Sequence, residues 1–222
     1  MILFKDCEIY HKYTNVDRLT SMTISNAELE AYYFQKLSDI ANQANYSMSS
    51  IDHLRKNLDC TIHVEVHPNE KIAVLFEKVN ITLHRNTSSR QNNVLIPLDD
   101  CSSNFLQVYD GGTSEFNRKI NYCSTETNQF FKSKSNRIFV RYSIQKRHKA
   151  DVTYFKITYN PYSQGDCSNS SFKCSDGSCI HPKLYCDGKR NCRSSNDENK
   201  CLEHFSDKKK TLSQQPSKFL IS

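Results

Sequence analysis

The 222-residue chain has no long hydrophobic run and only five glycines. Because a membrane-crossing helix needs about 18 or more consecutive apolar residues, no segment of this chain is predicted to span a bilayer. The glycines lie at positions 111, 112, 165, 177 and 188, too far apart to form a phosphate-binding loop. A Gly-x-Ser-x-Gly elbow and a His-Glu-x-x-His helix are also missing. These absences predict that the protein is not an enzyme.

A secretory leader is missing as well, since Lys5 and Asp6 interrupt the short apolar stretch at the start. We therefore expect a fragment of a secreted protein or of the ectodomain of a membrane protein, with any membrane association supplied by missing parts. The net charge of +6 comes with interspersed acids. Such a balance favours solubility and predicts no nucleic-acid partner.

Cysteine, by contrast, is abundant. The chain has ten cysteines, and six of them fall between residues 167 and 201. Cytosolic reducing systems would keep such thiols free, so this density predicts disulfides and an extracellular protein. Four Asn-x-Ser/Thr sequons agree with secretion and are candidate glycosylation sites: Asn45, Asn80, Asn86 and Asn169.

Alternating apolar residues between positions 60 and 160 predict β-strands. Half-buried strands need a second sheet to cover their apolar faces, so we expect an antiparallel β-sandwich. Residues 161–166 should form a short linker after it, and the tail 202–222 should be disordered. The clearest alternating sets are Ile62-Val64-Val66, Ile72-Val74-Phe76, Leu106-Val108, Ile138-Val140-Tyr142 and Phe155-Ile157-Tyr159.

Residues 25–44 have a helical period instead. Ser25 and Glu28 have the spacing of a capping box, which is typical of a helix start. We expect one amphipathic helix whose apolar stripe packs on the sandwich rather than recruiting a partner. The stripe consists of Leu29, Tyr33, Leu37, Ile40, Ala41 and Ala44.

The last six cysteines lie in a segment too short to fold on an apolar core alone, so cross-links or a metal must hold it. Their order is Cys167-x6-Cys174-x4-Cys179-x6-Cys186-x5-Cys192-x8-Cys201, with Phe172, Ile180, Asp187-Gly188 and Asp197-Glu198 between them. This segment closely resembles the LDL-receptor class A module. Spacing alone allows fifteen pairings. The resemblance implies three of them: Cys167 with Cys179, Cys174 with Cys192, and Cys186 with Cys201.

The same resemblance implies one calcium ion in an octahedral cage of oxygen atoms. Asp187, Asp197 and Glu198 match the carboxylate ligands of that family, and Leu184 and Lys189 would supply backbone carbonyls. Asn191 stands where the family has an aspartate, so we expect a site that is retained but weakened. Zinc is disfavoured because no Cys-x2-Cys pair occurs.

Two further departures concern ligand binding by this module. Leu184 replaces the usual aromatic residue, and Ser194 replaces a frequent aspartate beside the cage. In the family, the aromatic side chain and the cage carboxylates hold a lysine of the ligand. The module is therefore either a weakened lysine-docking site or a calcium-stapled spacer, and the sequence leaves both hypotheses open.

The preceding region resembles a CUB domain. The resemblance rests on Cys60-Thr-Ile-His-Val, on Cys101-Ser-Ser-Asn-Phe-Leu-Gln-Val-Tyr-Asp-Gly, on Cys123 and on Ser135-Asn-Arg-Ile-Phe-Val. It implies a disulfide between Cys101 and Cys123 and another between Cys7 and Cys60. The second would close a loop longer than is usual in the family and containing the predicted helix, so a partner of Cys7 outside this chain stays open.

Many CUB domains hold a calcium ion with one glutamate and two aspartates. No calcium is expected here, because the corresponding residues carry no carboxylate: Thr82, Asn104 and Gln145. A basic cluster follows these positions and either binds a sulfated glycan or forms a solvated turn. It consists of Lys146, Arg147, His148 and Lys149.

The expected fold class is mainly β. A CUB-like antiparallel β-sandwich (60–160), preceded by an N-terminal segment with the helical insertion (1–59), is followed by a small disulfide-rich calcium-binding module (167–201).

This order resembles that of neuropilin and tolloid-like proteins, which are auxiliary subunits of ionotropic glutamate receptors. The first hypothesis is a non-catalytic extracellular binding ectodomain, from a receptor or receptor-auxiliary protein, whose partner is an extracellular protein or receptor subunit. The alternative is the non-catalytic stem of a multidomain serine protease, secreted or membrane-anchored, because such proteases join the same modules.

Overall fold

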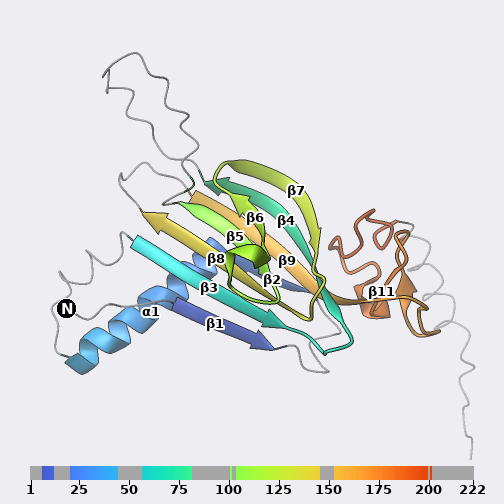
Figure 1. The fold of residues 1–222 in the computed structure, drawn as a ribbon, viewed down its shortest axis with the longest axis horizontal. Helices are drawn as coiled ribbons and strands as arrows, with labels where there is room; N and C mark the ends of the chain where they lie inside the picture. The colour runs from blue at the N-terminus through green and yellow to red at the C-terminus, as the bar shows by residue number, and fades with distance from the viewer. Residues whose placement is uncertain are drawn as a thin grey trace, which may run out of the picture.

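Two β-sheets packed face to face form the larger part of the structure, and a small C-terminal module lies at one end of them (Figure 1). The computed structural model describes residues 7–12, 21–44, 57–81, 101, 104–145, 153–199 and 201. Within these ranges, no helix has the length and apolar character needed to cross a lipid bilayer.

The first sheet has the strand order β1-β3-β8-β5-β6. Neighbouring strands are antiparallel except β1 and β3, which run parallel with Cys7 opposite Cys60. The strand bounds are β1 Cys7–Lys12, β3 Asn57–Glu65, β8 Arg137–Gln145, β5 Phe105–Asp110 and β6 Arg118–Tyr122.

The second sheet has the order β10-β11-β9-β4-β7, and β2 also pairs with β9. All of these pairs are antiparallel. The bounds are β2 Met22–Ser25, β4 Lys71–Ile81, β7 Thr125–Lys132, β9 Thr153–Gln164, β10 Phe172–Lys173 and β11 Ser178–Ile180. Because β10 and β11 belong to the C-terminal module, this sheet extends from the sandwich into that module.

The apolar core lies between the two sheets and confirms the predicted antiparallel sandwich. Burial of these side chains removes apolar surface from water, which is the main favourable contribution to folding. Within the core, the rings of Tyr142 and Phe155 pack edge to face with their centroids 4.8 Å apart. Every member of the predicted alternating sets is buried: Ile62, Val64, Val66, Ile72, Val74, Phe76, Leu106, Val108, Ile138, Val140, Tyr142, Phe155, Ile157 and Tyr159.

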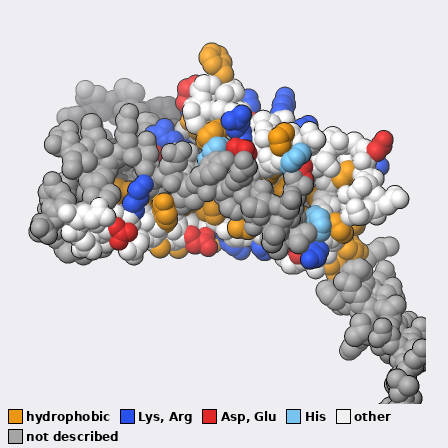
Figure 2. Space-filling model, turned by 90° about the horizontal axis from the view of Figure 1, so that it is seen from below, with side chains coloured by type: hydrophobic (Ala, Val, Ile, Leu, Met, Phe, Trp, Pro, Cys, Tyr) orange, Lys and Arg blue, Asp and Glu red, His pale blue; other side chains and the backbone are white. Residues whose placement is uncertain are grey.

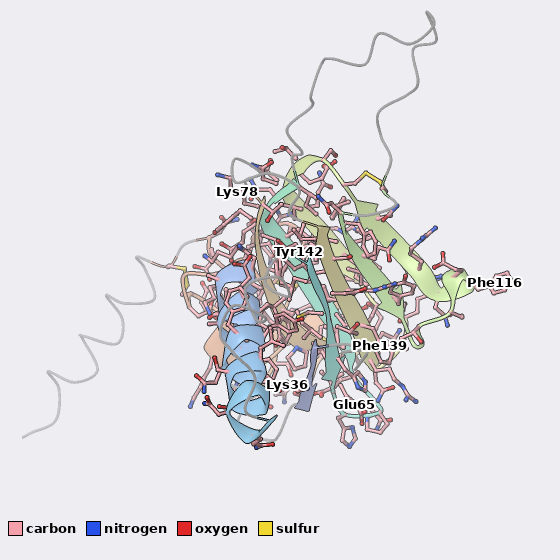
Figure 3. All side chains as sticks on the ribbon, turned by 90° about the vertical axis from the view of Figure 1, so that its left-hand side faces the viewer. Lys36, Glu65, Lys78, Phe116, Phe139 and Tyr142 are labelled. Atoms are coloured by element: carbon pink, nitrogen blue, oxygen red, sulfur yellow. A yellow bond between two sulfur atoms is a disulfide. The ribbon has the colours of Figure 1, made fainter. Side chains whose placement is uncertain are left out.

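Helix α1 spans Asn26–Ala44 and lies along one side of the sandwich (Figure 3). The capping box is formed, since the backbone N–H of Ser25 donates to Glu28 Oε2 at 2.7 Å. Leu29, Tyr33 and Leu37 are buried in the same core cluster as the strands. The predicted helix and its packing on the sandwich are both confirmed. The side chains of Ile40, Ala41 and Ala44 lie outside the described residues.

The predicted linker at residues 161–166 is wrong for its first four residues, because β9 continues to Gln164. Pro161 lies within the strand, opposite Ile72 of β4. On the other side of β9, β2 pairs with residues 156–159 and β11 with residues 163–164. Among the described strands, Pro161 therefore falls where β9 has a partner on one side only. A proline, which has no N–H to donate, is tolerated at such an edge position.

Candidate functional site

Disulfides cross-link the C-terminal module. Among its described residues, they join Cys167 to Cys179, Cys174 to Cys192, and Cys186 to Cys201. In the sandwich, Cys101 is joined to Cys123. Cys60 is disulfide-bonded, and its backbone pairs with that of Cys7. The bond between Cys7 and Cys60 stays a prediction, because the Cys7 side chain is not among those described.

Three oxygen atoms of the predicted calcium ligands converge on one point of the module, which we call the cage. The side-chain amide nitrogen of Asn191 lies at this point. It donates hydrogen bonds to the backbone carbonyl of Leu184 at 3.1 Å, to Asp187 Oδ1 at 2.9 Å and to the carbonyl of Lys189 at 3.0 Å. Gly188 adopts a φ of 81°, a left-handed conformation at the turn between two of these ligands. The chain thus folds around a centre lined by oxygen.

Asn191 is almost completely buried, with 1 % of its surface exposed. Its Oδ1 atom has no hydrogen-bond partner within the described part of the chain. An amide has a donor end and an acceptor end that exchange when the side chain rotates by half a turn. With the acceptor end turned inward, four oxygen atoms would surround the centre, and only a cation could hold them together.

Asp197 and Glu198 place further carboxylate oxygens beside the cage. Asp197 is fully buried, and no described group donates to its Oδ1 atom. Burial raises the pKa of Asp197 above its ordinary value, and the Asp187 carboxylate raises it further. Burial and Asp187 also raise the pKa of Glu198, whose carboxylate accepts from the N–H groups of Asp187 and Gly188. Among the described residues, no Lys, Arg or His side chain forms an ion pair with these carboxylates.

The side-chain and backbone oxygens of the cage together fit a calcium ion. The acids alone do not, since the described residues contain no group of three His, Cys, Asp or Glu side chains that could hold a metal. Backbone carbonyls and the Asn191 amide complete the oxygen set, and Ca²⁺ accepts such mixed ligands. The buried, unpartnered Asp197 Oδ1 atom is the observation that favours a cation here.

The residues that would dock a ligand's lysine are engaged within the chain. The Leu184 side chain is fully buried. The Oδ2 atom of Asp187 accepts a hydrogen bond from the Ser21 hydroxyl at 3.1 Å. Ser194 accepts from Ser175 at 2.5 Å and donates to Asn196 Oδ1 at 2.7 Å. Leu184 therefore provides no exposed aromatic platform, and the exposed Asp187 carboxylate already accepts the Ser21 hydroxyl.

An apolar cluster is shared between the sandwich and the module. Phe130 and Phe172 pack against it, and the Arg190 guanidinium lies 5.3 Å from the centre of the Phe130 ring. The Tyr162 hydroxyl donates to the backbone carbonyl of Ser133 at 3.0 Å, and burial raises the pKa of Tyr162 to about 12. The cluster contains Ala73 and Tyr162 from the sandwich and Cys174, Ile180, Leu184 and Cys192 from the module.

Polar contacts reinforce this boundary. Lys132 of β7 forms an ion pair with Asp176 at 2.6 Å. Lys189 Nζ reaches the backbone carbonyl of Ser21 at 3.1 Å and the hydroxyl of Thr23 at 3.4 Å. Sequence reasoning missed these contacts, because isolated serine and lysine residues far apart in the chain carry no pattern that indicates contact.

The outer face of the first sheet carries aromatic and charged side chains. A cavity of about 210 Å³ is lined by Thr61, Tyr109, Thr113, Phe139 and Arg141. Arg141 donates to both carboxylate oxygens of Asp59, at 2.9 and 2.5 Å, and these bonds raise its pKa further above the ordinary value.

Phe116 stands three residues beyond Thr113 and projects away from the body of the molecule (Figure 3). It lies in the short 3-10 helix η2, Glu115–Asn117, and is 94 % exposed. On the face seen in Figure 2, basic and acidic side chains are interspersed.

Several predicted sites lie outside the described residues, namely Thr82, Asn45, Asn86 and the basic cluster 146–149. Only the backbone of Gln145 is described. Asn104 is buried. Among the sequons, Asn169 is exposed, and Asn80 is half-buried with its Oδ1 atom accepting from Thr125 at 3.1 Å.

Comparison with known families and proteins gives the following matches. The model of the CUB domain family matches residues 35–159, and that of the low-density lipoprotein receptor domain class A matches residues 165–201. Human neuropilin and tolloid-like protein 2 is 27% identical over 146 residues, covering 66% of this chain and 25% of that protein. Mouse neuropilin and tolloid-like protein 1 is 26% identical over 146 residues, with 66% and 24% covered. The suppressor of tumorigenicity 14 protein homolog of Bos taurus is 25% identical over 149 residues, with 67% and 15% covered.

The chain thus spans a quarter or less of the length of these curated relatives. Among solved structures, the CUB1-EGF-CUB2 domains of rat MASP-1 align with a TM-score of 0.41 and 10% identity, covering 82% of this chain and 61% of that one. The extracellular region of zebrafish Gpr126/Adgrg6 aligns with a TM-score of 0.38 and 8% identity, covering 71% and 15%. The CUB model alone covers more than half of the chain. The chain therefore belongs to the CUB domain family, and a low-density lipoprotein receptor class A domain follows its CUB domain.

Proposed function

We propose that the chain is a non-catalytic extracellular binding ectodomain. In this proposal the CUB sandwich contacts an extracellular protein or receptor subunit, and the class A module is a calcium-stapled extension of the sandwich. The order of the two domains supports it, together with the similarity to neuropilin and tolloid-like proteins over about two thirds of the chain. The sequons, with Asn169 exposed, are consistent with a secreted glycoprotein.

The choice between a lysine-docking module and a spacer rests on one observation. Leu184 and Asp187, which would hold a ligand's lysine, contact the sandwich side of the molecule instead. A partner that inserted a lysine would have to displace the Ser21 hydroxyl from Asp187 and would find no exposed aromatic surface at Leu184. This favours the calcium-stapled spacer.

Partner binding is then expected at the sandwich. Phe116 is the best candidate contact, since aromatic side chains provide much of the energy at protein interfaces. Thr113, three residues before Phe116, lines the cavity together with Phe139 and Arg141. Arg118 and Lys119 lie two and three residues beyond Phe116 in the chain. The Arg118 charge is paired with Glu115 at 2.9 Å, so it is Lys119 that favours a partner surface with acidic groups.

Two measurements test this proposal. Isothermal titration of the whole chain with CaCl₂ should give one binding site, and an absence of binding would contradict the staple. Immobilised ectodomains of ionotropic glutamate receptors should bind the chain saturably in biolayer interferometry. If none of them binds and the coding sequence downstream of Ser222 encodes a trypsin-like domain, the protease-stem alternative replaces the receptor-auxiliary one.

A further inference from the structure

We propose that the calcium cage is held in position by the sandwich, with Ser21 and the Lys189 side chain as positioning residues that couple calcium binding to docking of the module. This inference rests on the proposed calcium staple. It goes beyond that staple by assigning part of the site to the segment before β2, more than 160 residues away in the chain.

Asp187 is the first of two residues that contact both the cage and the sandwich. Its Oδ1 atom accepts from the Asn191 amide inside the cage at 2.9 Å and from the N–H of Lys189 at 2.9 Å. Its Oδ2 atom accepts from the hydroxyl of Ser21 at 3.1 Å. Ser21 is only 5 % exposed, so its hydroxyl is held in place by the surrounding sandwich. The orientation of the carboxylate is thus fixed from both sides.

Lys189 is the second such residue. Its backbone carbonyl points into the cage, 3.0 Å from the Asn191 amide nitrogen, while its ammonium group binds the carbonyl of Ser21 and the hydroxyl of Thr23. A charged donor gives a stronger hydrogen bond than a neutral one. The same residue therefore supplies a metal ligand through its backbone and an anchor to β2 through its side chain.

The anchor continues into the second sheet. The Thr23 and Thr158 hydroxyls lie 3.0 Å apart, and Thr158 donates to Glu77 at 2.6 Å. Glu77 also forms an ion pair with Lys156 at 2.6 Å. A continuous polar network thus runs from the cage through β2 to β9 and β4.

Coupling follows from this arrangement. A bound ion that fixes Asp187 and the Lys189 carbonyl also fixes the groups that contact Ser21 and β2. Conversely, docking of the module on the sandwich orders these two ligands before the ion binds. Because coupling free energies are reciprocal, calcium should tighten the contact by the same factor by which the contact tightens calcium. The effect should equal the loss of one or two net hydrogen bonds, on the order of 3- to 10-fold in the dissociation constant.

The decisive variants are Ser21→Ala and Lys189→Met, alone and combined, in the whole chain. Lys189→Met keeps the backbone carbonyl that would bind the ion and removes only the ammonium group. Lys183→Met is the matched control, because Lys183 is an exposed lysine of the same module. Titration with CaCl₂ should give a dissociation constant for the double variant on the order of 3- to 10-fold above wild type, with the control unchanged.

Hydrogen exchange of the unmodified chain gives an independent readout. Saturating CaCl₂ should slow exchange of the amides of residues 22–25, and the double variant should lose this protection. If wild type binds calcium but the double variant has the same dissociation constant and residues 22–25 do not respond, the coupling is wrong while the staple stands. If wild type binds no calcium, the staple itself fails, and the inference fails with it.

Discussion

Lys132 Nζ and Asp176 Oδ2 lie 2.6 Å apart across the boundary between the CUB sandwich and the class A module. The two side chains are 17% and 28% exposed, so this pair is more shielded from water than an ordinary surface ion pair. Burial by itself would raise the pKa of Asp176, but the hydrogen bonds from Lys132 and Ser178 outweigh it and lower the pKa below its ordinary value of 3.8.

The first prediction concerns Asp176→Asn. At pH 7 this change should reduce the free energy of unfolding by about 1 kcal/mol, because a shielded, charge-assisted contact is lost. A carboxylate with a lowered pKa contributes stability that is complete above its ordinary pKa and is lost as pH falls through the folded-state pKa. The gap between wild type and variant should therefore be constant near neutrality and close at low pH. Urea unfolding followed by circular dichroism checks this, and a gap that persists unchanged well below pH 3.8 would contradict it.

The second prediction concerns Asn191→Asp. A carboxylate at this position restores a formal negative charge to the cage, so the calcium dissociation constant should fall by about 10-fold or more. In chelator, the same variant should be less stable than wild type, because a carboxylate cannot donate to the three oxygens that the Asn191 amide now binds. Titration calorimetry and melting curves with calcium or EDTA measure the two effects. Equal calcium affinities for both proteins would argue against the ligand role of residue 191.

The third prediction concerns Phe116→Ser. Since the side chain is 94 % exposed, the free energy of unfolding should change by less than about 0.5 kcal/mol. Binding to a glutamate receptor ectodomain should weaken by about 10-fold or more if this residue anchors the interface. Tyr32→Ser is the control, because Tyr32 is an exposed aromatic residue of α1. Equal loss of binding in both variants would exclude a specific role for Phe116.

The fourth prediction concerns the packing of α1. Leu37 is 3 % exposed and lies in the core cluster, so Leu37→Ala should destabilise the chain by about 2–5 kcal/mol. Lys36→Ala, on the exposed side of the same helix, should change stability by less than about 0.5 kcal/mol. Chemical denaturation of both variants measures the difference. Similar values for the two would mean that the helix does not contribute to the core.

Sequence patterns predicted the strands whose inward face is apolar at every second position and missed those with few apolar residues. β3, β4, β8 and β9 alternate clearly, and their inward residues form the core. β6 and β7 read Arg-Lys-Ile-Asn-Tyr and Thr-Glu-Thr-Asn-Gln-Phe-Phe-Lys, with few apolar positions to reveal the period. Their pairing depends on the neighbouring strands β5 and β4 rather than on a strong pattern of their own.

The cage residues could be named from the sequence because they lie close together in it and match a family pattern. The contact with the sandwich could not, since it joins Ser21 to residues of a module near the other end of the chain. The direction of the Asn191 amide was equally out of reach, because it depends on which oxygens surround it. The linker was misplaced for the same reason: a proline such as Pro161 usually interrupts a strand, and the pairing of β9 that tolerates it here involves distant segments.

Strand β9 has a mechanical consequence. It pairs with β4 along nearly its whole length within the sandwich and then carries β11 of the class A module. A pulling force applied to that module would act lengthwise on β9. The ladder between β9 and β4 would be loaded in shear, so many bonds would have to yield at once. The boundary between the two domains should therefore be a rigid connection that transmits tension and torque, rather than a flexible linker.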